Sequence, residues 1–286
     1  MIRSSASLII ASPIPTELLK NNKGSNYRIL MVKRNANSSF INAHVYPGGI
    51  IDKADSEWPR FKSGQSLLTQ KICAIRETFE ESGLLLADKC PRNIHHWRSR
   101  VHQDASQFQA MCNELELTPA VEKLLPFANW ITPVKEKKRY NTNFFLTILD
   151  QFKTQKEHED YLNHVMADGT ETLSFDWFKP EEALAKFQQK EIIMMPPQWY
   201  SLYLMSLIQD FKELHKAGNN IFRTSDNQLI PILPQPKASN NSEYAGYLAY
   251  PGDEEYDNGQ KNKRHRLYFK GRPMNEYKLE INISKL

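Results

Sequence analysis

The chain has 286 residues, a formal net charge of +4, and a content of 40% hydrophobic and 24% charged residues. This composition is typical of a soluble globular protein, and so mild a charge predicts no nucleic-acid partner. The cysteines Cys73, Cys90 and Cys112 are odd in number and lack metal-type spacing, which excludes a disulfide framework and favours a reducing compartment. No apolar stretch approaches the roughly 18–20 residues of a membrane span, so we expect none.

The first part of the chain predicts strands and then one helix. Residues 5–12 and 27–34 are apolar, β-prone runs separated by turn residues, which indicates antiparallel strands. Residues 43–49 predict a short strand that ends at a Pro-Gly-Gly break. A loose segment follows, and then a helix from about residue 66 to Ser82, with Gly83 placed to cap its C-terminus.

The remaining elements alternate irregularly. Residues 94–126 carry apolar side chains at helical spacing and predict one or two helices. Further on we expect strands at 127–133 and 141–150, a strand and a helix within 173–184, a longer helix at 196–214, and short β-like pieces after about residue 218. Strands and helices mix without regular βαβ alternation, which predicts an α+β sandwich.

The helix that ends at Ser82 separates two kinds of side chain. At 100° per residue, its apolar positions fall in one arc and its carboxylates fall opposite; the apolar set is Leu68, Ile72, Ile75 and Phe79, and the acidic set is Glu77, Glu80 and Glu81. One interpretation is an ordinary solvent-exposed helix face. The other is a site for hard divalent cations, which take oxygen ligands, with Arg76 holding a carboxylate in place from one turn away.

The residues around these carboxylates resemble the Nudix box, G-x5-E-x7-R-E-U-x-E-E-x-G-U, in which U is apolar. Its second half matches Arg76 to Leu84, with Thr78 alone departing from the apolar pattern. The first half departs, because Arg76 follows Gly49 by 27 positions (76 − 49) where the pattern has 14, so the loop carries 13 extra residues. The early Glu of the box has two candidates here, Asp55 and Glu57, and the sequence does not decide between them.

The expanded loop is similar to the peroxisomal acyl-coenzyme A diphosphatase branch of the Nudix hydrolases. Five further segments look like that branch: 38–52, 97–119, 129–133, 139–146 and 196–200. The resemblance implies a Nudix α/β/α sandwich with a mixed sheet, a helical insertion at about 94–126 and a C-terminal extension. We therefore expect a Nudix domain at 1–215 and an extension at 216–286.

The resemblance also implies a reaction and a cofactor. The reaction is hydrolysis of the diphosphate bond of coenzyme A and acyl-CoA to 3′,5′-ADP and (acyl-)4′-phosphopantetheine, and the cofactor is Mg²⁺ or Mn²⁺. The expected metal ligands are Glu77, Glu80 and Glu81; Glu80, Glu81 and Arg76 belong to the expected catalytic set. Two alternatives stay open: a Nudix enzyme for ADP-ribose, a dinucleotide or an RNA cap, and a Nudix-like binding module without catalysis.

The general base and the substrate contacts are less defined. Members of the family use either a box Glu or a Glu on a later loop as base, and Glu171 is our first choice among Glu157, Glu159, Asp160 and Glu171. Coenzyme A carries a 3′-phosphate, for which Arg34, Arg139 or Lys137 is a candidate contact. Gly48 and Gly49 complete the expected substrate-binding set. His95, His96 and His265 are expected on the surface.

The last three residues are Ser284, Lys285 and Leu286. A C-terminal Ser-Lys-Leu is the address read by the peroxisomal import receptor. We therefore expect that receptor as a partner and the peroxisomal matrix as the location.

Overall fold

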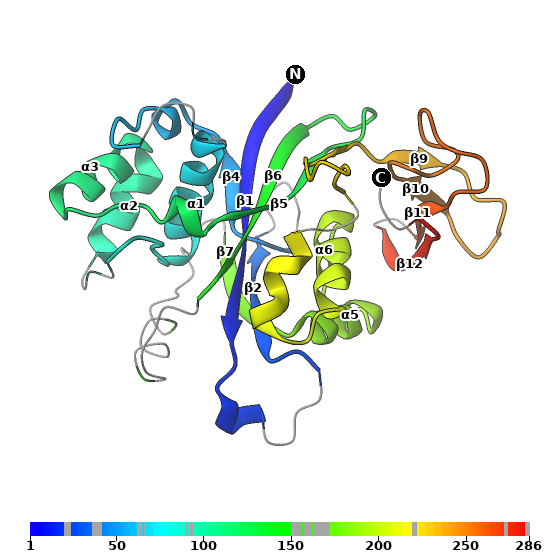
Figure 1. Cartoon of the computed structure of the whole chain (residues 1–286), viewed down its shortest axis with the longest axis horizontal. Helices are drawn as coiled ribbons and strands as arrows, with labels where there is room; N and C mark the ends of the chain where they lie inside the picture. The colour runs from blue at the N-terminus through cyan, green and yellow to red at the C-terminus, as the bar shows by residue number, and fades with distance from the viewer. Residues whose placement is uncertain are drawn as a thin grey trace.

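A computed structural model describes most of the chain and shows two sheets flanked by helices (Figure 1). The described residues are 1–19, 24–35, 42–61, 65, 67–89, 91, 94–149, 156, 162, 172–218, 222–271 and 274–283.

The main sheet is mixed and is built around one long central strand, β1 (Ile2–Pro13). Its strands in the described residues follow the order β3-β2-β1-β6-β5-β8, with β4 also paired to β1 and β7 to β2. The pairs β1–β6 and β5–β8 are parallel and the others are antiparallel. The other strands are β2 (Tyr27–Arg34), β3 (His44–Val45), β4 (Gly48–Ile50), β5 (Leu125–Ile131), β6 (Arg139–Ile148), β7 (Thr172–Phe178) and β8 (Pro231–Ile232).

Alternation along β1 directs its side chains into two separate cores, because successive residues of a strand point to opposite faces. Leu8 and Ile10 pack with three helices on one face of the sheet, whereas Ile9 and Ala11 pack with two helices on the other. The first group is α1 (Leu68–Ser82), α2 (His95–Gln103) and α3 (Ser106–Glu114); the second is α5 (Pro180–Gln188) and α6 (Pro196–Ser206). Figure 1 shows these groups on either side of the sheet, which confirms the predicted α+β sandwich and the helical insertion at 94–126.

Short 3₁₀ turns connect several of these elements. They are η1 (Thr16–Leu19), η2 (Lys53–Ser56), η3 (Val121–Lys123) and η4 (Phe211–Gly218).

Two of the predicted elements need correction. Gly48 and Gly49 do not break a strand, because they begin β4 and pair with Ser7 and Ala6 of β1. The helix predicted at 196–214 ends at Ser206. The chain turns there because Asn26 binds it, accepting from the Phe211 amide at 2.7 Å and donating to the Asp210 carboxylate at 3.0 Å.

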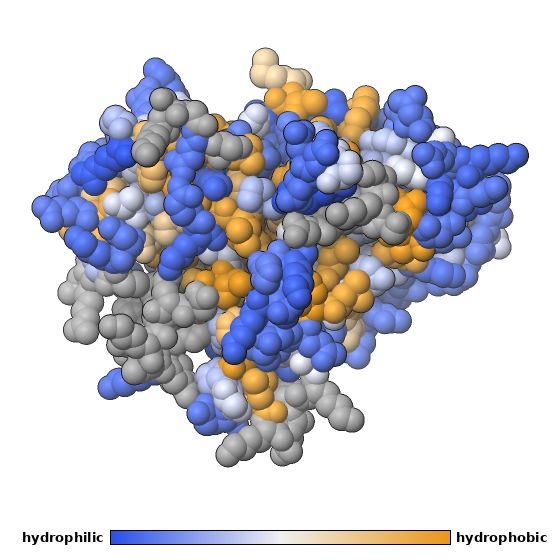
Figure 2. All heavy atoms as spheres, in the orientation of Figure 1, coloured by the Kyte–Doolittle hydropathy of each residue, from blue (hydrophilic) through white to orange (hydrophobic). Residues whose placement is uncertain are grey.

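The C-terminal part of the chain forms a second, four-stranded antiparallel sheet in the order β12-β11-β10-β9. Its strands are β9 (Gln235–Lys237), β10 (Gly246–Ala249), β11 (His265–Lys270) and β12 (Asn275–Ile281). Leu248 and Leu267 pack into the same core as α5 and α6. Figure 2 shows this sheet on the right of the molecule under a largely polar surface.

His265 lies inside this shared core, so the expectation of a surface histidine is wrong. It is fully buried, donates from Nδ1 to the Pro251 carbonyl at 2.7 Å and accepts at Nε2 from the Tyr200 hydroxyl at 2.8 Å. Burial lowers the pKa of His265 to about 4, so the ring is neutral and ties the second sheet to α6.

Within the part of the chain that the structure describes, the helices are too short or too polar to cross a membrane.

Candidate active site

Helix α1 is buried on both of its faces. Its apolar arc packs on the sheet through Ile72, Ile75 and Phe79, each at most 1% exposed. The acidic face is also covered, since Glu80 and Glu81 are 7% and 4% exposed. The interpretation as a solvent-exposed helix face is therefore wrong, and burial of charged side chains requires specific partners.

Arg76 supplies several of those partners at once. Its guanidinium is 4% exposed and donates to Asp55 at 2.7 and 2.8 Å, to Glu80 at 2.6 Å and to Glu77 at 3.0 Å. Burial by itself would lower the pKa of Arg76, but the hydrogen bonds with Asp55 and the charge of Glu77 raise it well above its ordinary value. Arg76 therefore stays charged and joins the loop after β4 to the helix.

The contact with Arg76 decides which residue replaces the early Glu of the box. Asp55 is 1% exposed and binds Arg76 with both carboxylate oxygens, a geometry that gives strong, oriented pairs. Glu57 instead points to solvent, 62% exposed, beside Lys53. Asp55 thus takes the position, and the extra residues of the loop lie after it, before α1.

Glu81 is fixed from two sides. Arg34 donates to Oε1 at 2.7 Å, and the backbone amide of Gly48 donates to Oε2 at 3.0 Å. Arg34 also donates to the Gly48 carbonyl at 3.0 Å. The structure therefore places Arg34 against a box glutamate in the centre of the site.

Gly49 lets Glu77 reach the backbone of β4. A Cβ at Gly49 would lie 2.4 Å from the Glu77 carboxyl group, which is shorter than a van der Waals contact allows. Gly48 is required for a different reason, because its φ is +154° and a Cβ there would lie 2.3 Å from the Ala6 carbonyl oxygen. The adjacent glycines thus bring β4 close to both the helix and β1.

Glu77 and Glu80 bind protons more tightly in this environment than an ordinary glutamate does. Burial raises the pKa of Glu77 and of Glu80 to about 7 each, against the opposing charge of Arg76; repulsion from Glu80 adds to the rise at Glu77, and repulsion from Glu81 adds to the rise at Glu80. A bound cation would reverse that effect, since opposite charge favours the ionised form.

The donor chemistry fits a hard divalent cation, although the side chains do not converge on one. Among the described residues, no group of three or more His, Cys, Asp or Glu side chains is placed to hold a metal ion together. Glu80 is turned to Arg76 and Glu81 to Arg34, so the two arginines occupy oxygens that a cation would use. Carboxylate oxygens of this kind are the ligands that Mg²⁺ and Mn²⁺ prefer.

Two residues of the helical insertion also contact the site, and sequence reasoning missed both. Arg98 donates to the backbone carbonyls of Glu80, at 2.6 Å, and Glu81, which belong to the last turn of α1 and lack partners within it. His102, one turn later, has Nδ1 3.6 Å from Glu80 Oε2. The spacing of Arg98 and His102, four residues apart on one predicted helix, places both on the same helix face and could have indicated a shared contact surface.

Two of the remaining predicted residues, Arg139 and Lys137, are not part of this cluster. Arg139 begins β6 beside Ile2, and its Nε donates to the Thr132 carbonyl at 3.1 Å. Lys137 is exposed in the preceding turn. The base candidates Glu157, Glu159, Asp160 and Glu171, and the tripeptide Ser284, Lys285 and Leu286, lie outside the described residues.

Comparisons with known proteins agree with this geometry. The model of the NUDT19 Nudix domain matches residues 62–205. The acyl-coenzyme A diphosphatases NUDT19 of Xenopus laevis and Gallus gallus are 29% and 27% identical over 82% and 91% of this chain and 74% and 82% of their own. The crystal structure of a Nudix hydrolase from Alicyclobacillus acidocaldarius has a TM-score of 0.62 at 19% identity, covering 76% of this chain and 96% of that one, and so shares the fold.

Half of the chain therefore matches one family model, and the matched region holds α1 with its buried arginine and glutamates. The protein belongs to the Nudix family and is a Nudix hydrolase that resembles the NUDT19 branch.

Proposed function

We propose that this protein hydrolyses the diphosphate bond of coenzyme A and acyl-CoA, giving 3′,5′-ADP and (acyl-)4′-phosphopantetheine. The observation that carries the proposal is the cluster of Glu77 and Glu80 at Arg76 and of Glu81 at Arg34, which concentrates ligands for cations on one helix. The substrate class is supported by the similarity to proteins named acyl-coenzyme A diphosphatases.

Nudix hydrolases generally use divalent metal ions. Bound at Glu77, Glu80 and Glu81, Mg²⁺ or Mn²⁺ would neutralise the diphosphate and lower the pKa of a water nucleophile. Arg76, itself held by Asp55, positions Glu80, and Arg34 with Gly48 orients Glu81. Glu171 is the proposed base, and Arg139 a proposed contact for the 3′-phosphate.

The chain divides, in this proposal, into a Nudix domain at 1–215 and an extension at 216–286. Ser284, Lys285 and Leu286 would direct it to the peroxisomal matrix through the import receptor, which reads such a tripeptide at a free carboxyl terminus. Attaching a fluorescent protein at the N-terminus, with and without Leu286, tests the location.

A substrate panel tests the reaction directly. The purified protein is incubated with Mg²⁺ or Mn²⁺ and, in parallel, with coenzyme A, an acyl-CoA, ADP-ribose and NADH, and the products are identified by mass. We expect kcat/KM to be highest for the coenzyme A compounds and to fall to background in EDTA. Preference for ADP-ribose or NADH would overturn the proposed substrate.

A further inference from the structure

A pocket lies away from α1, on the outer face of the C-terminal sheet. It has a volume of about 520 Å³ and is lined by residues of β10, β11, β12 and the loops before and after β10. Figure 1 places α1 and the C-terminal sheet on opposite sides of the main sheet. The sheet turns Leu267 and Phe269 into the core, so Arg266 and Tyr268 point outward into the pocket.

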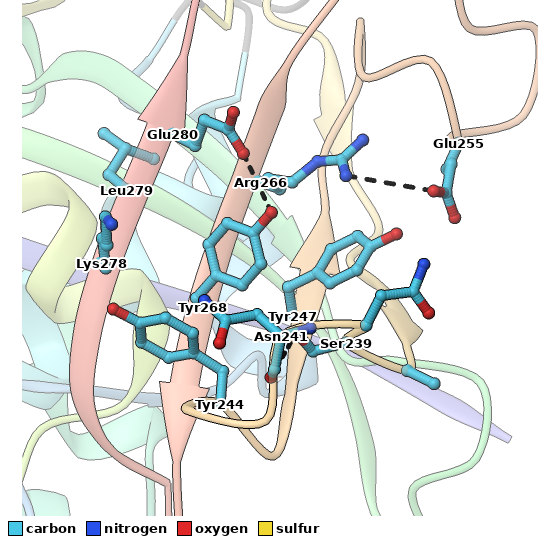
Figure 3. Close-up of a pocket in the computed structure, with 12 residues that line it drawn as sticks. Ser239, Asn241, Tyr244, Tyr247, Glu255, Arg266, Tyr268, Lys278, Leu279 and Glu280 are labelled. Atoms are coloured by element: carbon cyan, nitrogen blue, oxygen red, sulfur yellow. Dashed lines mark hydrogen bonds and ion pairs between the residues drawn. The ribbon is translucent and has the colours of Figure 1, made fainter.

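Three tyrosine rings form one side of the pocket (Figure 3). The centroids of Tyr244 and Tyr247 lie 5.1 and 5.3 Å from that of Tyr268, with interplanar angles of 44° and 50°. Tyr244 and Tyr268 are half-buried, so part of each ring is open to solvent, whereas Tyr247 is 4% exposed. Aromatic surfaces at the mouth of a polar pocket suit a planar heterocyclic ring.

At the rear of the pocket, Arg266 is held by an ion pair with Asp253. Arg266 lies 4.6 Å from the Tyr247 centroid and binds Asp253 through two hydrogen bonds of 2.8 and 2.6 Å. Those bonds lower the pKa of Asp253, although burial by itself would raise it, so the pair stays charged. Asp253 therefore holds the Arg266 side chain in place and compensates its charge.

The mouth of the pocket carries charges of both signs. Glu280 accepts from the Tyr268 hydroxyl at 2.9 Å and lies 3.9 Å from Arg264, and Glu255 lies 3.9 Å from Arg266. Lys278 differs: it is exposed, its ammonium lies 5.9 Å from the centroid of the Tyr244 ring, and it forms no ion pair within 4.0 Å with a carboxylate of the described residues. A phosphate group beside the rings would meet this cation.

From this arrangement we propose that the pocket binds a purine mononucleotide, with its base against Tyr244 and Tyr268 and its phosphate at Lys278. Side chains that can pair with a base edge, Ser239 and Asn241, line the same opening. The volume fits one nucleotide, and the lining carries equal numbers of Glu and basic residues, which disfavours a longer polyanion. The proposal does not rest on the activity proposed above.

Isothermal titration calorimetry with AMP tests the proposal on the whole chain in EDTA. Without divalent cations, the clustered carboxylates of α1 repel a phosphate, so the measured heat of binding comes from the pocket on the C-terminal sheet. We expect one AMP per chain, weaker binding of adenosine and of ribose 5-phosphate, and a loss of about tenfold or more in affinity for Tyr244→Leu and Lys278→Glu.

Matched variants separate this site from a general effect on the fold. Tyr244→Phe keeps the ring, and Lys261→Glu makes the same charge change on an exposed residue outside the pocket, so both are expected to bind AMP as the unchanged protein does. Absence of AMP binding, equal affinity in all four variants, or binding of single-stranded oligoadenylate that AMP does not displace would each overturn the proposal.

Discussion

Asp55 and Arg76 form a buried, two-pronged ion pair, with Nε–Oδ1 at 2.7 Å and Nη2–Oδ2 at 2.8 Å. The pair joins the loop that follows β4 to the helix that carries the glutamates. Removing one partner of such a pair leaves the other charge buried and uncompensated.

Asp55→Asn should therefore destabilise the protein. An amide offers Arg76 one acceptor and one opposing donor, so we expect the free energy of unfolding in urea at pH 7 to fall by about 3–5 kcal/mol. Glu57→Gln is the matched control, since Glu57 is exposed, and its unfolding midpoint should not change. Equal midpoints for the two variants would contradict the prediction, because Asp55 would then stabilise the protein no more than Glu57 does.

Gly48→Ala and Gly49→Ala should have different consequences although the residues are adjacent. A Cβ at Gly48 meets the backbone of Ala6 and Ser7, which cannot move aside, so we expect the melting temperature to fall by several degrees. At Gly49 the Cβ meets the end of a flexible side chain, Glu77, which can turn away. Gly49→Ala should keep most of its thermal stability and lose turnover of coenzyme A, and the reverse order would contradict this geometry.

Glu80→Gln and Glu81→Gln test whether the cluster is catalytic. Each removes a negative ligand while keeping shape, and we expect kcat to fall about 10²- to 10³-fold, as for loss of a main electrostatic element. The control is Glu114→Gln, which alters an exposed residue at the end of α3 and should retain full turnover. Undiminished turnover in either cluster variant would show that the proposed metal ligands do not carry the catalysis, whereas absence of turnover in the unchanged protein would favour a binding module.

The raised pKa values of Glu77 and Glu80, about 7 each, set a pH dependence for the metal-free protein. Between about pH 4.5 and 7 the native state binds more protons at this cluster than the unfolded state does, so the cluster makes stability fall as the pH rises. In EDTA, the free energy of unfolding of the unchanged protein should fall as the pH rises over this range. For Glu80→Gln we expect that fall to be smaller by about 2–3 kcal/mol. Parallel pH profiles would mean that the cluster does not titrate there.

Arg98 is expected to position the last turn of α1. Arg98→Lys replaces a fork that reaches the carbonyls of Glu80 and Glu81 by a single ammonium, so kcat should fall while KM for coenzyme A changes little. The required Mn²⁺ concentration, measured from activity titrations, should rise, because Glu80 and Glu81 are less well fixed. Arg100→Lys alters an exposed arginine of the same helix and should change neither quantity; a matching shift there would assign the effect to α2 as a whole.

Local chemistry made part of this protein predictable. The helix from Leu68 to Ser82 follows from its 3.6-residue periodicity, and its end follows from Gly83, which adopts φ +77° and donates to the Phe79 carbonyl at 2.8 Å. The antiparallel pairing of β1 with β2 follows from two apolar runs joined by a turn. These features depend on neighbours in the sequence, so spacing alone suffices.

Contacts between distant residues were not predictable in the same way. Spacing put Asp55 at the nominal position of the box Glu and Glu57 nearby without deciding between them, and the contact with Arg76, 21 residues beyond Asp55, separates them. His265 is neutral and buried because Tyr200, 65 residues earlier, lies beside it, and α6 stops at Ser206 because Asn26 binds the chain that follows.

The sequence by itself determined the helix, its cap, the three box glutamates and the family, because each is written in adjacent residues. The tertiary structure alone decided that the acidic face is buried, that Asp55 and Arg34 hold Arg76 and Glu81, and that Arg98 reaches α1 from the insertion. The reason is physical: burial and ion pairing depend on which surfaces meet in space, and a one-dimensional pattern does not specify that meeting.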